Sequence, residues 1–112
     1  MTSPSARLAA EREETLRRIA ALRGDVDAIV GSASSTTGDD EHDPEGATIG
    51  FERAQAMALL DQAQEHLAAI DAACERVADG SYGRCLECGG NIATARLEAR
   101  PEAARCIACA SR

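Results

Sequence analysis

The chain has 112 residues and a net charge of -7, and all twelve of its basic residues are Arg. An acidic chain is a poor general ligand for nucleic acid. The absence of a run of about 18 apolar residues argues against a transmembrane helix, and the N-terminus lacks the apolar segment of a secretory signal. With one Phe, one Tyr and no Trp, the chain lacks the large side chains of a compact core. We therefore expect a cytoplasmic protein built from an extended helical element and a small domain.

The first periodic segment predicts a helix over residues 5–30. Ser3, followed by Pro4 and an Ala-rich run, is typical of a helix start. Seam positions then recur at alternating intervals of four and three, as in a helix that packs along a partner helix. The polar members Arg12 and Thr15 weaken the first half of this seam. Its positions are Leu8, Arg12, Thr15, Ile19, Leu22, Val26 and Ile29.

Residues 31–49 are rich in Ser, Thr, Gly and Asp, include Pro44, and predict a connecting loop. This loop is acidic and contains no Lys or Arg. Carboxylates at the end of a hairpin could meet basic residues of a partner or perturb a metal site. The alternative is that they belong to an ordinary solvated loop, and the residues alone leave both interpretations open. The carboxylates are Asp39, Asp40, Glu41, Asp43 and Glu45.

A second periodic segment predicts a helix over residues 50–78. Two matching seams joined by one loop predict an antiparallel two-helix coiled-coil hairpin over residues 1–78. The seam includes Cys74, which we interpret as a small buried hydrophobe and not as a redox group, because no basic residue next to it would lower the pKa of its thiol. The seam positions are Ala56, Leu60, Ala63, Leu67, Ile70, Cys74 and Val77.

The remaining residues, 79–112, contain the motif C-x2-C-x17-C-x2-C, formed by Cys85, Cys88, Cys106 and Cys109. This spacing predicts one tetrahedral zinc held by four thiolates, which leaves no open coordination position and makes the ion structural. Two disulfides, free buried thiols or a thiol redox pair are the alternatives, although a redox pair would be expected within a βαβ pattern that is absent. We expect an apolar patch beneath the zinc, formed by Ile92, Leu97 and Ile107.

The segments Asp79-Gly-Ser-Tyr-Gly-Arg-Cys-Leu-Glu-Cys-Gly, Ala95-Arg-Leu-Glu-Ala-Arg-Pro101 and Cys106-x2-Cys109 together resemble the DksA/TraR C4-type zinc-finger family. The resemblance implies a mainly α fold that pairs a coiled coil with a zinc module. It also implies binding to bacterial RNA polymerase, with the hairpin tip in the secondary channel near the catalytic magnesium, where it modulates initiation together with the nucleotide ppGpp. The partner-binding tip would comprise Asp39, Asp40, Asp43, Glu45 and Ala47.

The tip departs from the family pattern of two aspartates three apart, followed two residues later by alanine. Counting back from Cys85 places His42, Glu45 and Ala47 at these positions. Asp40 and Asp43 keep the spacing but put Glu45 at the alanine position. Because the sequence ends at Arg112, we do not expect the contacts of the family's C-terminal helix, and whether ppGpp acts with this chain stays open.

Three functional classes remain at this stage. The first is a regulator that acts on RNA polymerase without reading a DNA sequence itself. The second is a zinc-stapled nucleic-acid-binding module, and the third is a redox switch in which cysteine oxidation ejects the zinc. Neither His42 nor His66 has a nucleophile partner in the sequence, so we expect no enzymatic activity. We expect a monomer, although the same seams could pair two chains. The basic residues of the second class are Arg84, Arg96, Arg100 and Arg105.

Overall fold

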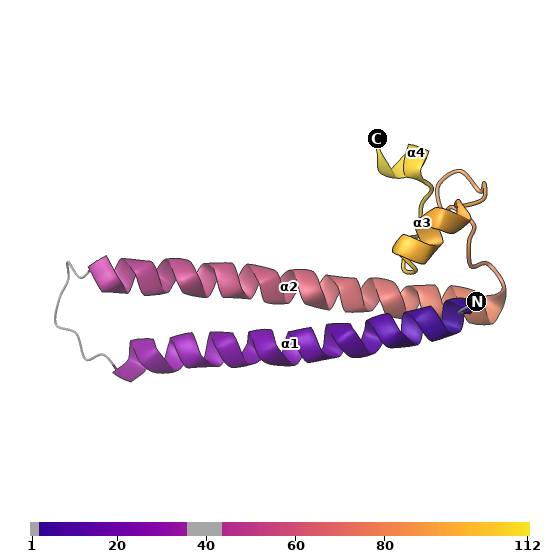
Figure 1. Ribbon diagram of the computed structural model, residues 1–112. Coiled ribbons are helices and arrows are strands. Elements are labelled where there is room, and N and C mark those ends of the chain that lie inside the picture. Colours follow the sequence, from indigo (N-terminus) through magenta and orange to yellow (C-terminus); the bar gives the residue numbers. More distant parts are fainter. Residues whose placement is uncertain (1–2, 36–43) are drawn as a thin grey trace. The chain divides into compact units, whose positions relative to one another are not determined.

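The computed structural model describes residues 3–35 and 44–112, which form four helices (Figure 1). Within these ranges the β structure is limited to an isolated antiparallel bridge between Arg84 and Asn91. None of the described helices is long and apolar enough to cross a bilayer. The predominance of helix over the described residues confirms the predicted mainly α fold. The helices are α1 (Pro4–Ser35), α2 (Pro44–Asp79), α3 (Thr94–Ala99) and α4 (Ile107–Ala110).

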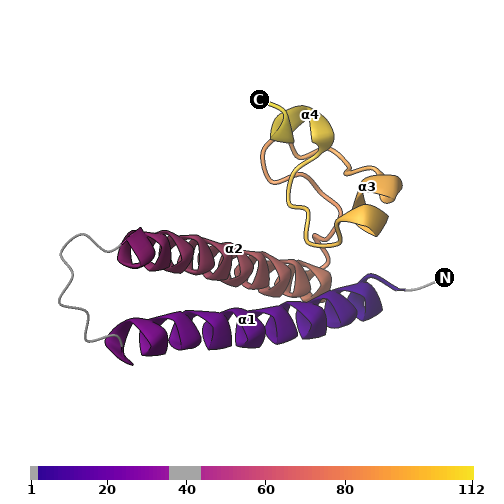
Figure 2. The same cartoon turned by 60° about the vertical axis from the view of Figure 1, so that its left-hand side comes forward.

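The chain divides into two compact units, and the long helices α1 and α2 contribute to both. Unit 1 comprises Met1–Thr15 and His66–Arg112, and unit 2 comprises Leu16–Glu65. Within each unit, α1 and α2 lie side by side and run in opposite directions, as the two views in Figures 1 and 2 agree. The antiparallel pairing follows from the two apolar seams, because each helix can bury its stripe only against the other.

In unit 2 the buried positions are Ile19 and Leu22 on α1 and Ala56 and Ala63 on α2. All four belong to the predicted seams. Alanine side chains let the two backbones approach closely but remove little apolar surface from water. Each Å² of apolar surface removed stabilises the folded state by about 25 cal/mol. Packing in this unit is therefore only moderately stabilising.

In unit 1 the helices pack through Leu8 and Ile70, both 0% exposed, together with the buried Ala73. Thr15 is also buried, and its hydroxyl donates a hydrogen bond of 2.8 Å to the carbonyl oxygen of Glu11. This bond inside α1 satisfies the hydroxyl, which explains how a polar residue occupies a seam position.

Polar side chains pair across the two helices of unit 1 beside this apolar contact. Arg12 Nε donates to Asp71 Oδ1 at 2.8 Å, and His66 Nε2 lies 2.9 Å from Glu11 Oε1. Arg12 is an exposed residue. It therefore lies at the margin of the helix contact and not within it.

The seam prediction was wrong at Cys74, which is exposed, while the neighbouring Ala73 is 0% exposed. From Ile70 the buried stripe advances by three residues to Ala73, and then by four to Val77, which packs against the same cluster. The prediction assumed the opposite order of steps. Cys74 is therefore not a buried hydrophobe.

The predicted helix limits were also too narrow, because α1 continues to Ser35 and α2 already begins at Pro44. Proline suits the first position of a helix, where its missing N–H has no partner to lose. Gly31 and Gly50 each cost about 1 kcal/mol relative to alanine, which is too little to end a helix that is already propagating. At the start of α1, Ser3 Oγ accepts a hydrogen bond of 3.1 Å from the amide of Ala6, as expected for a cap.

The predicted tip residues are only partly covered by the described ranges. Asp39, Asp40 and Asp43 lie outside them. Glu45 and Ala47 fall in the first turns of α2, without a description of their side chains. Their proposed role therefore rests on the sequence.

Candidate metal centre

The four predicted cysteines come together in unit 1, with all four sulfur atoms within 4.8 Å of one another. Cys88 Sγ and Cys106 Sγ are 3.9 Å apart. Around a tetrahedral zinc with bonds of about 2.3 Å, neighbouring sulfurs are separated by about 3.8 Å. The cluster therefore fits the size and chemistry of a four-thiolate zinc site. Cys85 and Cys109 are buried, whereas Cys88 is exposed.

The first C-x2-C pair is held by a tight turn. The amide of Gly89 donates to the carbonyl oxygen of Cys85 at 3.0 Å, and the amide of Cys85 donates to the carbonyl oxygen of Gly90 at 2.7 Å. Gly89 has φ = 75°, a conformation that glycine adopts without steric cost. The amide of Gly90 points at Cys88 Sγ, 3.4 Å away. Such an amide stabilises negative charge on the sulfur.

The second C-x2-C pair lies at the short helix α4. Cys106 precedes its first residue, Cys109 lies within it, and the amide of Ala110 donates to the carbonyl oxygen of Cys106 at 2.9 Å. The amide of Leu86 donates to the carbonyl oxygen of Ala104 at 2.9 Å. This last bond ties the two pairs together, so their convergence does not depend on the sulfurs alone.

An apolar cluster supports the site. It contains Ile92, Leu97, Ala103 and the two buried cysteines, and Tyr82 and Cys106 pack against it. The predicted patch was correct for Ile92 and Leu97 and wrong for Ile107, which is 69% exposed. Ile107 opens α4, and Ala103 is buried in the cluster instead.

Tyr82 is a supporting residue that the sequence analysis missed. It packs against the cluster of Ile92 and Leu97 and also against the cluster of Leu8 and Ile70. Its hydroxyl donates a hydrogen bond of 2.8 Å to the carbonyl oxygen of Pro101. Burial raises the pKa of this hydroxyl, since the phenolate would lose solvation. The Tyr-Gly pair before Cys85 was the only signal available, and it indicates no packing partner.

The four thiols are not electrically equivalent. Backbone amides of Cys88 and Cys106 donate toward Cys85 and lower the pKa of its thiol to about 6. A hydrogen bond with the side chain of Cys106, together with burial, raises the pKa of the Cys109 thiol to about 12. Crowded thiols resist carrying several negative charges at once. Binding of a divalent cation must therefore expel protons, which makes affinity rise with pH.

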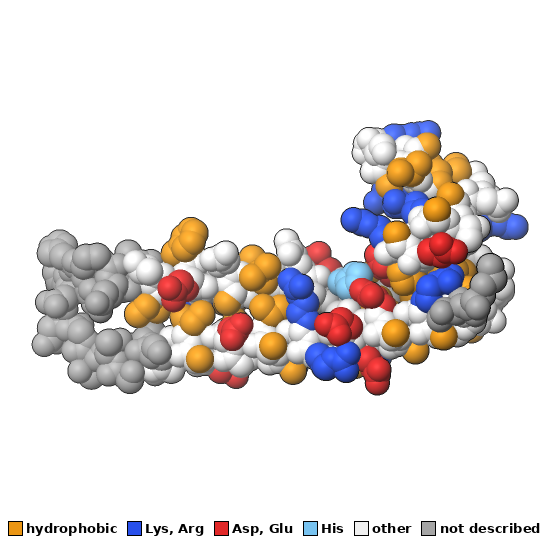
Figure 3. Space-filling model, in the orientation of Figure 1, with side chains coloured by type: hydrophobic (Ala, Val, Ile, Leu, Met, Phe, Trp, Pro, Cys, Tyr) orange, Lys and Arg blue, Asp and Glu red, His pale blue; other side chains and the backbone are white. Residues whose placement is uncertain are grey.

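The arginines of this region lie on its surface, and blue side chains gather over it on the face drawn in Figure 3. Arg84, Arg100 and Arg105 are exposed. Arg96 Nε donates to the carbonyl oxygen of Arg105 at 2.9 Å and so helps to hold the loop before Cys106. At least one of the four arginines named for the alternative nucleic-acid-binding class therefore has a structural contact of its own.

Known proteins share both the local motif and the fold. The prokaryotic dksA/traR C4-type zinc finger family matches residues 80–112. The solved structure of transcription factor DksA2 from Pseudomonas aeruginosa is similar over 96% of this chain and 82% of that one, with 32% identity and a TM-score of 0.58.

The chain belongs to the DksA/TraR family. Two curated DksA/TraR relatives, both named RNA polymerase-binding transcription factor DksA and found in two strains of Caulobacter vibrioides, are each 46% identical over 57 residues. That match covers 51% of this chain but 40% of each relative. The DksA/TraR member described here is thus comparable with them over less than half of their length. The predicted family is confirmed.

Proposed function

We propose that this protein binds bacterial RNA polymerase in the cytoplasm and regulates transcription initiation as a monomer, without catalysing a reaction and without reading DNA sequence itself. The observation that carries this proposal is the similarity to DksA2 over 96% of the chain, which includes both long helices as well as the cysteine cluster. The relatives that share the zinc-finger sequence are named for binding polymerase.

We further propose that Cys85, Cys88, Cys106 and Cys109 hold a single structural zinc. Sulfur atoms within 4.8 Å of one another support this assignment. With the four thiolates in place the ion has no open position for substrate or water, so its contribution is to fix the fold of residues 80–112.

The paired helices are proposed to enter the secondary channel with the acidic segment foremost. A carboxylate-rich end suits a basic channel or the neighbourhood of a catalytic metal ion. The residues proposed to act there are Asp39, Asp40, Asp43, Glu45 and Ala47.

The test is binding of the zinc-loaded protein to purified RNA polymerase in competition with a known secondary-channel binder. The test variant is Asp40→Asn/Asp43→Asn/Glu45→Gln, and the charge-matched control is Glu75→Gln/Glu87→Gln/Glu98→Gln, which changes three exposed carboxylates outside the acidic segment. We expect competed binding, and we expect the test variant to alter transcription more than affinity. Absence of binding at micromolar concentration would overturn the proposal. The same assay with and without ppGpp tests whether that nucleotide takes part.

A further inference from the structure

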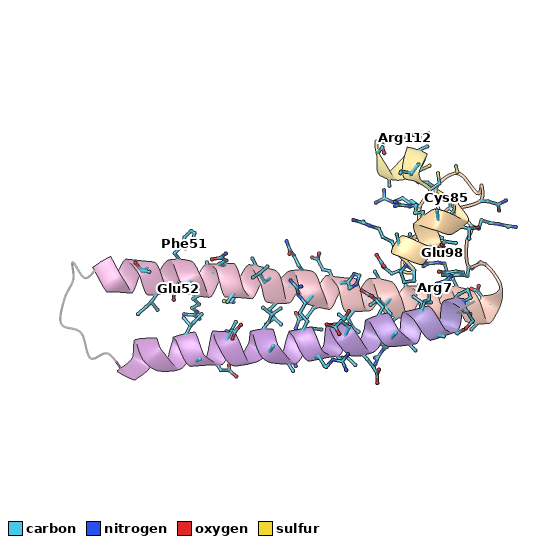
Figure 4. All side chains as sticks on the ribbon, viewed as in Figure 1. Arg7, Phe51, Glu52, Cys85, Glu98 and Arg112 are labelled. Carbon is cyan, nitrogen blue, oxygen red and sulfur yellow. The ribbon has the colours of Figure 1, made fainter. Side chains whose placement is uncertain are left out.

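Phe51 is the only phenylalanine of the chain, and it is 71% exposed on α2 in unit 2. Figure 4 shows its side chain pointing away from α1. A single exposed apolar residue is common on protein surfaces and indicates nothing by itself. Phe51 becomes informative because of the surface that it adjoins.

A groove of about 350 Å³ opens between α1 and α2 within the same unit. Gln55 and Leu59 of α2 line it, four and eight residues after Phe51. Residues at this spacing follow one another along a single helix face. The ring therefore lies beside the groove and outside its lining, and we call the ring and the groove together the Phe51 surface. It consists of Phe51 and the groove residues Leu22, Asp25, Ala28, Ile29, Glu52, Gln55, Ala56 and Leu59.

The charge of this surface indicates the chemistry of its partner. Asp25 and Glu52 contribute the only ionisable side chains among the groove residues, and both residues are exposed. An Arg or Lys side chain has an apolar stem and a cationic head, which match an apolar groove that carries carboxylates. Charge complementarity thus favours a basic protein segment as the occupant.

We propose that the Phe51 surface binds a basic segment of RNA polymerase, with the Phe51 ring in an apolar pocket of the polymerase and an Arg or Lys side chain of the polymerase in the groove. This inference rests on the proposed function. It adds to that function by placing a main determinant of affinity on the helices α1 and α2. Aromatic anchors of this kind commonly dominate the energy of an interface, while charges at its margin set the rate and salt dependence of association.

The experiment measures the affinity of zinc-loaded variants for polymerase at low and high salt. We expect Phe51→Ala to weaken binding at least about tenfold at both salt concentrations. We expect Asp25→Asn/Glu52→Gln to weaken binding mainly at low salt, where charges are least screened. Met57→Ala is the matched control, because Met57 is a large apolar residue of the same helix, 43% exposed and outside the groove. It should bind within about twofold of the unmodified protein.

The outcomes separate this inference from the function on which it rests. If the unmodified protein does not bind polymerase, the proposed function itself fails. If the unmodified protein binds and Phe51→Ala binds equally well, only the Phe51 inference is overturned. Sedimentation of the free protein provides a further check, because a dimer that Phe51→Ala dissociates would assign the surface to self-association and overturn the inference. Circular dichroism of each variant, and of a Phe51→Leu variant as well, establishes that the helices are intact.

Discussion

Cys74 and Cys88 are both exposed cysteines, yet they have very different surroundings. Cys88 lies among three other sulfurs, whereas Cys74 lies on the surface of α2 outside that cluster. Exposure alone therefore does not distinguish a metal ligand from an isolated thiol. The distinction comes from the convergence of two short turns. The C-x2-C spacing encodes each turn, whereas a single cysteine encodes none.

A pair of matched variants tests the metal assignment at this scale. Loss of a residue that only hydrogen-bonds to a metal ligand typically lowers metal affinity ten- to hundredfold. Cys88→Ser removes a ligand itself, so we expect it to lower zinc affinity by more than this. We expect Cys74→Ser to retain one zinc per chain. Native mass spectrometry and competition with a chromogenic chelator measure both quantities. Equal zinc retention by the two variants would contradict the assignment of Cys88.

Tyr82→Phe tests the hydroxyl bond to the carbonyl oxygen of Pro101. We expect the free energy of unfolding of the zinc-loaded protein to fall by about 1 kcal/mol at neutral pH. Since burial raises the pKa of Tyr82 in the folded state, its contribution to stability is complete below the unfolded pKa of about 10 and is lost as pH rises through the folded pKa. The stability difference between the two proteins should therefore shrink above about pH 10. Urea titrations across this pH range measure it, and a constant difference would contradict the argument.

At the scale of the helices, the spacing of apolar residues predicted most of the contact between α1 and α2. The periodic positions Ile19, Leu22, Ala56 and Ala63 are all buried as expected. Pattern alone could not choose between Ala73 and Cys74, because both are small and apolar and they occupy adjacent positions. The helix ends were also misjudged, because Ser, Thr and Gly only weakly oppose the extension of an existing helix.

The convergence of the four cysteines was predictable because the spacing within each C-x2-C pair encodes a tight turn. The contact between Tyr82 and Pro101 joins residues nineteen apart, and the path of the intervening chain determines it. Such a contact has no periodic signature. The sequence therefore predicted which atoms form the candidate metal centre but not which side chains support it.

The two kinds of contact between α1 and α2 should differ in strength. Ile70 is 0% exposed, so we expect Ile70→Ala to lower the free energy of unfolding by about 2–5 kcal/mol. The side chains of Arg12 and Asp71 are 45% and 50% exposed, so Arg12→Ala should lower the free energy of unfolding far less than Ile70→Ala, and less still in high salt. Denaturant unfolding of the zinc-loaded variants measures both changes. A cost for Arg12→Ala as large as that for Ile70→Ala would contradict this ranking.

At the scale of the whole chain, the region around the cysteines has little regular structure of its own. Helix α3 has six residues and α4 has four, and both are too short to be stable in isolation. Its apolar cluster is also small. We infer that metal binding supplies most of the free energy that orders residues 80–112.

Removal of zinc with a chelator should therefore collapse the spread of amide resonances from residues 80–112. Resonances from unit 2, residues 16–65, should shift little, because that unit is held by its own helix packing. Heteronuclear NMR spectra before and after chelation test this expectation, and re-addition of zinc provides the control. Unchanged dispersion for residues 80–112 in the metal-free protein would contradict it.

Because Tyr82 packs against both apolar clusters, its position bears on how long this protein survives in a cell. Loss of the metal would withdraw the ring from Leu8 and Ile70 and loosen the contact between the first part of α1 and the last part of α2. Proteases cleave segments that open most readily. We therefore expect zinc starvation to shorten the half-life of this protein, so that metal supply would change its abundance without any change in its synthesis.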